Sequence, residues 1–107
     1  MNRTVTIAGK EYGVSINALT PVLYHQVFKK NFFEEIQNIQ TNTEVLKEIT
    51  YIMVKRYEAG SPDKMALSLA DYEQWLEGFG MFDFELAGAE IAAIITEQSQ
   101  VTVVPKE

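Results

Sequence analysis

The sequence predicts an α+β fold, mostly helical, in which an N-terminal two-stranded β-hairpin packs on a bundle of about four helices. Apolar and polar residues alternate over residues 3–16, and a period of two is typical of strands. Beyond this segment the apolar residues recur every three or four positions, which indicates amphipathic helices. Because an isolated hairpin is marginally stable in water, we expect it to pack on the helices.

The hairpin is expected to turn at Gly9-Lys10, because glycine at the first central position suits a type II′ turn. This turn would place Ile7 opposite Tyr12. The same register pairs Val5 with Val14, so that all four side chains lie on the face that covers the helices. A turn one residue earlier would pair the apolar Ile7 with Lys10. This mismatch favours the turn at Gly9-Lys10.

The first helix is predicted over residues 21–30. Thr20 can cap it, and Pro21 fits the first helical position, where the missing N–H would have had no helical partner. The apolar pattern continues over residues 32–39 and predicts a second short helix after a break near Asn31.

A longer helix is predicted over residues 44–59, capped by Thr43 and ended by the glycine and proline that follow it. The next is expected over residues 71–79, because Ser68-Leu-Ala-Asp71 resembles a capping box and two glycines follow the apolar pattern. The last is expected over residues 84–97, with Asp83 as its cap.

One domain is predicted over residues 1–98, followed by a C-terminal tail over residues 99–107 that is an edge strand or a flexible end. A chain of 107 residues is long enough for one modest core. Small residues in the last helix, Ala89, Ala92 and Ala93, would allow another helix to approach closely.

Charge and composition exclude several classes of protein. The net charge is −6, and residues 63–107 carry nine acids against two bases, which disfavours nucleic-acid binding. No window approaches the roughly 20 apolar residues of a membrane helix, so no membrane association is expected. The chain has no cysteine, which excludes disulfides and thiolate metal sites.

Catalytic chemistry is not visible in the sequence. His25 is the only histidine, and a structural or surface role is the simplest interpretation of one imidazole without an orienting partner. The serines show no nucleophile elbow, and no glycine-rich loop resembles a phosphate cradle. We therefore expect no enzyme activity, no cofactor and no metal.

Aromatic residues are numerous for so small a core. Neighbouring rings in residues 32–33 and 79–84 must point in different directions, so some should remain exposed, and exposed rings beside methionine favour protein contacts. The alternative is that most of these rings are core residues. The candidate partner-binding residues are Phe32, Phe33, Phe79, Met81, Phe82 and Phe84.

The order of these segments resembles the tail assembly chaperones of long-tailed bacteriophages. The resemblance is carried by the hairpin motif Ile7-Ala-Gly-Lys-Glu-Tyr12 and by Leu19-Thr-Pro at the start of an aromatic helix. It extends to the later segments Tyr72-Glu-Gln-Trp-Leu and Phe82-Asp-Phe-Glu.

The resemblance implies a non-catalytic, self-associating protein of the host bacterial cytoplasm that is absent from the mature virion. Such a protein binds the tape measure protein and keeps it soluble, and a longer product made by ribosomal frameshifting recruits the tail tube protein. Two alternatives remain open at this point: a structural head–tail or tail component, and a small bacterial protein–protein adaptor.

Overall fold

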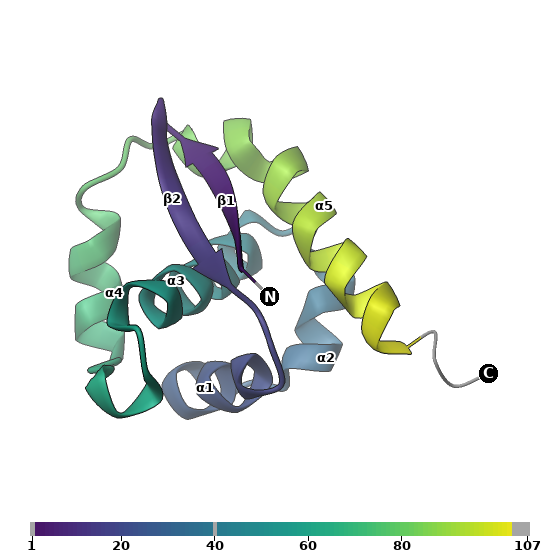
Figure 1. The fold of residues 1–107 in the computed structure, drawn as a ribbon. Coiled ribbons are helices and arrows are strands. Elements are labelled where there is room, and N and C mark those ends of the chain that lie inside the picture. Colours follow the sequence, from purple (N-terminus) through teal and green to yellow (C-terminus); the bar gives the residue numbers. More distant parts are fainter. Residues whose placement is uncertain (1, 40, 104–107) are drawn as a thin grey trace.

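The computed structural model describes residues 2–39 and 41–103 and confirms the predicted hairpin on a helical body (Figure 1). Strands β1 (Asn2–Ile7) and β2 (Lys10–Ser15) form an antiparallel two-stranded sheet. The helices that follow are α1 (Leu19–Phe28), α2 (Phe32–Glu35), α3 (Thr43–Ala59), α4 (Leu69–Leu76) and α5 (Asp83–Val103). Two short 3-10 turns, Ile36–Asn38 and Pro62–Lys64, lie between them.

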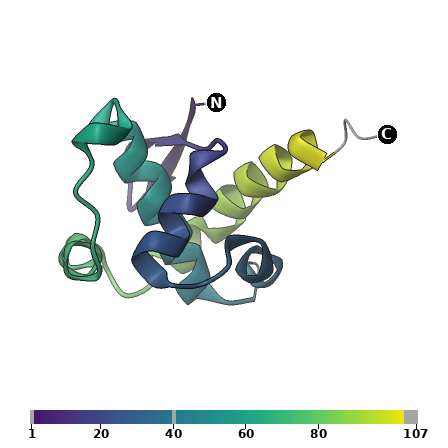
Figure 2. The same ribbon diagram turned by 90° about the horizontal axis from the view of Figure 1, so that it is seen from below.

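The hairpin lies across α3, with α4 on one side and α5 on the other (Figure 1). Strand β2 packs mainly on α3, and β1 packs on α5. Seen from below, α1 and α3 lie near the middle of the molecule, and the C-terminal turns of α5 extend beyond the other helices (Figure 2). The hairpin therefore joins the two longest helices, and α5 forms one edge of the molecule.

The predicted hairpin register is wrong, although the faces of the strands are right. The turn is Ala8-Gly9, and both residues have positive φ, 56° and 79°, as a type I′ turn requires. Ile7 therefore pairs with Lys10, and Val5 pairs with Tyr12. Moving the turn by one residue shifts the pairing by two positions, so the apolar side chains stay on the buried face.

The Ile7–Lys10 pair, which argued against this register, is accommodated at the exposed end of the hairpin. Ile7 is fully buried, whereas the Lys10 ammonium lies 5.2 Å from the centre of the Tyr12 ring. The Lys10 side chain therefore stays exposed to water, with its ammonium group over the face of the Tyr12 ring, and no charge is buried.

Helix α1 begins two residues earlier than predicted and is not capped by Thr20. The Asn17 side chain accepts a hydrogen bond from the N–H of Leu19 (2.8 Å), and the buried Thr20 hydroxyl accepts one from the N–H of Asn17 (3.0 Å). The helix ends at Phe28, because Lys29 adopts a left-handed conformation with φ of 59°.

The other helix boundaries show which capping predictions are correct. Asn42, and not Thr43, caps α3 and accepts from the N–H of Glu44 at 3.0 Å. Ser68 caps α4 as predicted and accepts from the N–H of Asp71 at 3.0 Å. The short helix α2 after Asn31 is also confirmed, since that side chain is its N-cap.

Helix α5 replaces the start of the predicted tail. The tail predicted over residues 99–107 as an edge strand or a flexible end is helical over residues 99–103, which continue α5 to Val103. The chain has no glycine or proline between Gly88 and Pro105, so nothing in that stretch ends a helix. Residues 104–107 lie outside the described residues.

The core contains a tyrosine cluster, which we define as Tyr24, Tyr51 and Tyr72. All three are buried, and each hydroxyl group donates a hydrogen bond to a carboxylate. These bonds are Tyr24 to Glu48 (2.7 Å), Tyr51 to Asp71 (2.6 Å) and Tyr72 to Glu44 (3.4 Å). Burial, reinforced by these carboxylates, raises the pKa of each phenol well above its usual value of 10.0.

Candidate functional site

The described residues do not bring catalytic groups together. His25 lies on the exposed face of α1, with its Nδ1 3.4 Å from the carbonyl oxygen of Lys30. Within residues 2–39 and 41–103 no group of three or more histidine or acidic side chains could hold a metal ion. The candidate site is an exposed apolar surface at the start of α5.

Three exposed apolar side chains lie at the start of α5. Met81, Phe82 and Leu86, which we call the α5 edge, are 82%, 60% and 84% exposed. The N–H of Leu86 donates to the carbonyl oxygen of Phe82 at 3.0 Å, so these two residues are one helical turn apart on one face. The α5 edge therefore presents three large apolar side chains to solvent together.

The local fold explains why these side chains point outward. Phe79 and Phe84, which flank Met81 and Phe82, turn inward and pack on each other with ring centres 4.9 Å apart. The carboxylate of Asp83 accepts a hydrogen bond from the N–H of Gly80 at 2.6 Å and holds the turn between α4 and α5. With Phe84 buried and Phe79 half-buried, the two residues between them are left on the outside.

The six candidate residues divide into three groups. Phe33, Met81 and Phe82 are exposed, as a partner-binding role requires, and Phe79 is half-buried against the core. Phe32 and Phe84 are core residues in this structure, only 5% and 1% exposed, so the exposure expected of a contact residue is not found for them. Phe33 lies on α2, at a distance from the N-terminal end of α5 (Figure 1).

Phe32 is buried because adjacent residues on a helix point in directions about 100° apart. Its ring packs edge-on against Tyr24 at 5.7 Å, and the neighbouring ring of Phe33 is exposed. Phe84 is buried because it packs against Trp75, 5.6 Å away, as well as against Phe79. A divergent pair of rings thus supplies one core residue and one surface residue.

Sequence reasoning missed Leu86, the most exposed large apolar residue in the part of the chain that the structure describes. The sequence carries the signal: Ala87, Ile91, Ile94 and Ile95 recur at helical spacing, and these four residues form the buried stripe of α5. Leu86 lies outside that stripe and four residues after Phe82, so the helical spacing places it on the outer face.

A groove of about 760 Å³ runs beside the α5 edge, between α5 and the start of α3. Ile39 and Leu46 line one side, and Gly88, Ala89 and Ala93 line the α5 side. Ala89 and Ala93 continue the helical spacing of Phe82 and Leu86, so the groove and the α5 edge lie along one line. Bulky apolar side chains stand at one end of this line and small ones form its floor.

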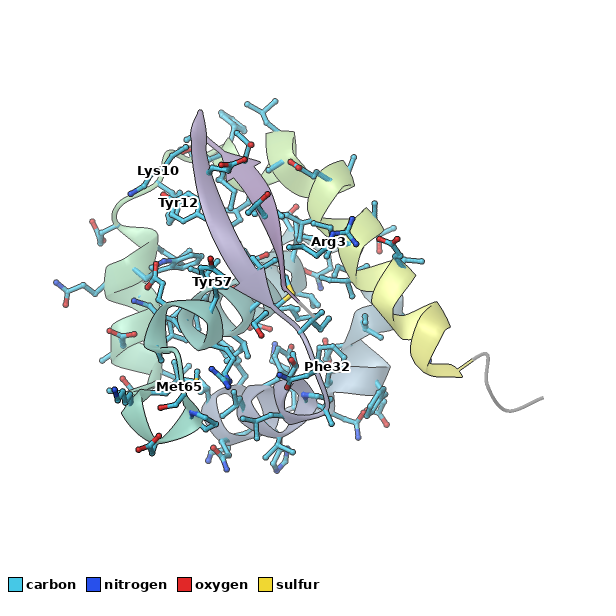
Figure 3. The ribbon with its side chains drawn as sticks, viewed as in Figure 1. Arg3, Lys10, Tyr12, Phe32, Tyr57 and Met65 are labelled. Carbon is cyan, nitrogen blue, oxygen red and sulfur yellow. The ribbon has the colours of Figure 1, made fainter. Side chains whose placement is uncertain are left out.

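Acidic groups surround this surface. Helix α5 carries Asp83, Glu85, Glu90 and Glu97 and has no lysine or arginine. Glu85 and Glu97 line the groove about three turns apart. Arg3 donates to Glu97 at 2.7 Å (Figure 3), whereas no basic side chain of the described residues pairs with Glu85.

Comparisons with known proteins do not assign a family. No family model matches the sequence, and no curated protein or solved structure matches it either. None of the helices within residues 2–39 and 41–103 has the length and hydrophobicity that crossing a lipid bilayer requires.

Proposed function

We propose that this protein is a non-catalytic tail assembly chaperone that binds the tape measure protein of a long-tailed phage and keeps it soluble. The observation that supports this function best is the α5 edge, where three large apolar side chains are exposed together on an acidic protein. Clustered exposed apolar residues are typical of protein-binding surfaces. The resemblance in the hairpin and aromatic segments supplies the class of partner.

The energetics of such a surface suit a chaperone. Burying an exposed methionine, phenylalanine or leucine side chain stabilises a complex by roughly 1.5–3 kcal/mol each. Part of that gain is lost because association removes translational and rotational freedom. A few apolar anchors therefore give binding that can be reversed, as tail assembly requires when tube subunits replace the chaperone.

The negative charge of the second half of the chain supports the same function. Like charges on neighbouring chaperones repel, so a partner coated with them would stay dispersed. We further propose that the protein acts in the host bacterial cytoplasm, is absent from the finished virion, and associates with itself. A frameshifted longer product would recruit the tail tube protein.

Co-expression with the tape measure protein encoded by the same phage or prophage tests this proposal. We expect the soluble fraction of the tape measure protein to rise several-fold when the chaperone is present. The variant Met81→Ser/Phe82→Ser/Leu86→Ser should lose this effect, because it removes the three apolar anchors and leaves the buried Phe84 and the half-buried Phe79 intact.

The matched control is Val22→Ser/Leu69→Ser, which removes two apolar side chains that are 48% and 54% exposed on α1 and α4. This variant should solubilise the partner as well as the natural sequence does. If the chain does not change the solubility of the tape measure protein, the proposed function is wrong. Equal losses in both variants would show that the α5 edge is not its binding surface.

A further inference from the structure

We infer that the groove between α3 and α5 holds one amphipathic helix of the partner, with an apolar stripe and basic residues at its ends. This inference rests on the proposed function and names the segment of the tape measure protein that the chaperone would recognise. It is carried by the size, lining and charge of the groove and by its alignment with the α5 edge.

The length of the groove suits a helix of about three turns. Glu85 and Glu97 line it and are twelve residues apart on α5, which corresponds to about 18 Å at 1.5 Å per residue. A volume of about 760 Å³ exceeds what a single side chain occupies and is open to a run of them. The occupant is therefore a segment of polypeptide that lies along α5.

The lining suits close packing of that segment. Gly88, Ala89 and Ala93 keep the floor of the groove low, so the axis of a second helix can come near the lower end of the usual 8–10 Å separation. Ile39 and Leu46, only 6% and 3% exposed, lie at the base of the opposite side and would give the apolar stripe of the bound helix an apolar floor. At the N-terminal end of α5 the same stripe would meet Phe82 and Leu86.

The carboxylates that line the groove determine which kind of helix would bind in it. Carboxylates at both ends of the groove attract basic residues and repel acidic ones. Glu97 is already close to Arg3, so the stronger attraction is expected at Glu85. Exposed pairs of this kind contribute up to about 1 kcal/mol each, which makes charge a means of discrimination and leaves apolar packing as the main source of affinity.

The same charges argue against a second copy of α5 as the occupant. Two α5 helices packed side by side would bring their acidic residues together without a single lysine or arginine on either helix. Like charges in contact oppose association. Self-association of the protein would therefore use another surface.

The probe for this inference is a synthetic amphipathic helix of about 14 residues, built from leucine and alanine, with lysines at both ends. Binding is measured by fluorescence anisotropy with a labelled peptide. We expect saturable binding to the natural protein. The variant Ala89→Leu/Ala93→Leu, which fills the groove at two exposed positions, should bind at least about tenfold more weakly.

Two matched controls accompany this variant. Ala70→Leu makes the same change at an exposed position on α4 and should leave peptide binding unchanged. A peptide with glutamates in place of the lysines should bind several-fold more weakly, and the variant Glu85→Gln should reduce that difference. Both controls keep the helix propensity of the altered segment high.

Several outcomes would overturn the inference: no binding of the basic peptide, equal binding by Ala89→Leu/Ala93→Leu, or equal binding of the acidic peptide. A dimer that Ala89→Leu/Ala93→Leu dissociates in sedimentation velocity would also overturn it, because a second copy would then occupy the groove.

Solubilisation of the tape measure protein is measured on the same variants. If it occurs and does not depend on the groove, the inference fails and the proposed function stands. If the basic peptide binds in the groove and the tape measure protein is not solubilised, the proposed function fails and the groove remains a helix-binding site.

Discussion

The tyrosine cluster and the α5 edge use large side chains in opposite ways. Tyr24, Tyr51 and Tyr72 bury their rings between α1, α3 and α4, and each buried hydroxyl has a carboxylate acceptor. The α5 edge leaves Phe82, Leu86 and Met81 in solvent, although these side chains have no polar group that would favour exposure.

The difference between the two regions indicates that the tyrosine cluster serves the stability of the fold, whereas the α5 edge does not. Burying a phenol requires a hydrogen-bond partner, and the core supplies one for each member of the cluster. Exposing three apolar side chains does nothing for the stability of the isolated protein. Under the proposed function a partner covers the α5 edge, and variants in the two regions should separate stability from binding.

The largest expected effect is on Phe84 and is tested against its exposed neighbour Phe82. Phe84→Ala should lower the free energy of unfolding by about 3–5 kcal/mol, because it leaves a cavity beside Trp75 and Phe79. Phe82→Ala should change it by less than about 0.5 kcal/mol. Urea denaturation followed by circular dichroism measures both. A large loss in Phe82→Ala would mean that this ring belongs to the core.

Alkaline pH should destabilise the protein through the tyrosine cluster. The folded pKa of each of the three phenols is raised above 10.0, mainly by burial, so the folded state keeps protons that the unfolded chain releases above pH 10. This stability is fully present below pH 10 and falls as the pH rises, by up to about 1.4 kcal/mol per tyrosine and pH unit. Urea midpoints between pH 8 and pH 11 measure the decline, which should be smaller in Tyr24→Phe; a flat profile would contradict the buried phenols.

Removing one hydroxyl from the tyrosine cluster should have a smaller effect. Tyr24→Phe leaves the buried Glu48 with Lys30, 3.0 Å away, as its remaining partner and should cost about 1.5–3 kcal/mol of stability. The control is Tyr57→Phe, because Tyr57 is half-exposed and its hydroxyl makes no hydrogen bond within the described residues. Equal effects of the two changes would show that the Tyr24–Glu48 bond contributes nothing.

The smallest expected effect concerns the contact between the hairpin and α3. A methyl group at Gly13 would overlap the ring of Tyr57, which lies against β2 (Figure 3). Gly13→Ala should therefore destabilise the protein by about 1 kcal/mol. In a Tyr57→Ala background the same change should be neutral or stabilising, because alanine restricts the unfolded chain. A double-mutant cycle by urea denaturation measures this coupling, and additive effects would contradict the contact.

The sequence predicted the architecture from periodicity and failed where local alternatives were close in energy. The alternation over residues 3–16 placed the correct side chains on the buried face of the hairpin. It did not select the turn, because moving the turn by one residue preserves that face, and the left-handed conformation of Ala8 has no signal in an alanine. Capping shows the same limit, since Asn42 and Thr43 are both good caps and only the backbone decides between them.

The candidate site was predicted in outline and wrong in detail. Crowded rings over residues 79–84 correctly indicated exposed apolar residues at the start of the last helix. Which rings are exposed depends on tertiary contacts: Phe84 finds Trp75 and Phe79, whereas Phe82 finds none of them. The groove could not be predicted, because Leu46 of α3 and Ala93 of α5 line it together only once the two helices pack.

Hydrogen–deuterium exchange of the protein, alone and with the co-purified tape measure protein, tests the central claim most directly. The first amides of a helix lack intrahelical acceptors, so those at the start of α5 exchange quickly unless a partner covers them. We predict protection of peptides that span residues 79–93, with no change in α1 and α4. Protection confined to α1 and α4, with exchange over residues 79–93 unchanged by the partner, would contradict the claim that the α5 edge is the binding surface.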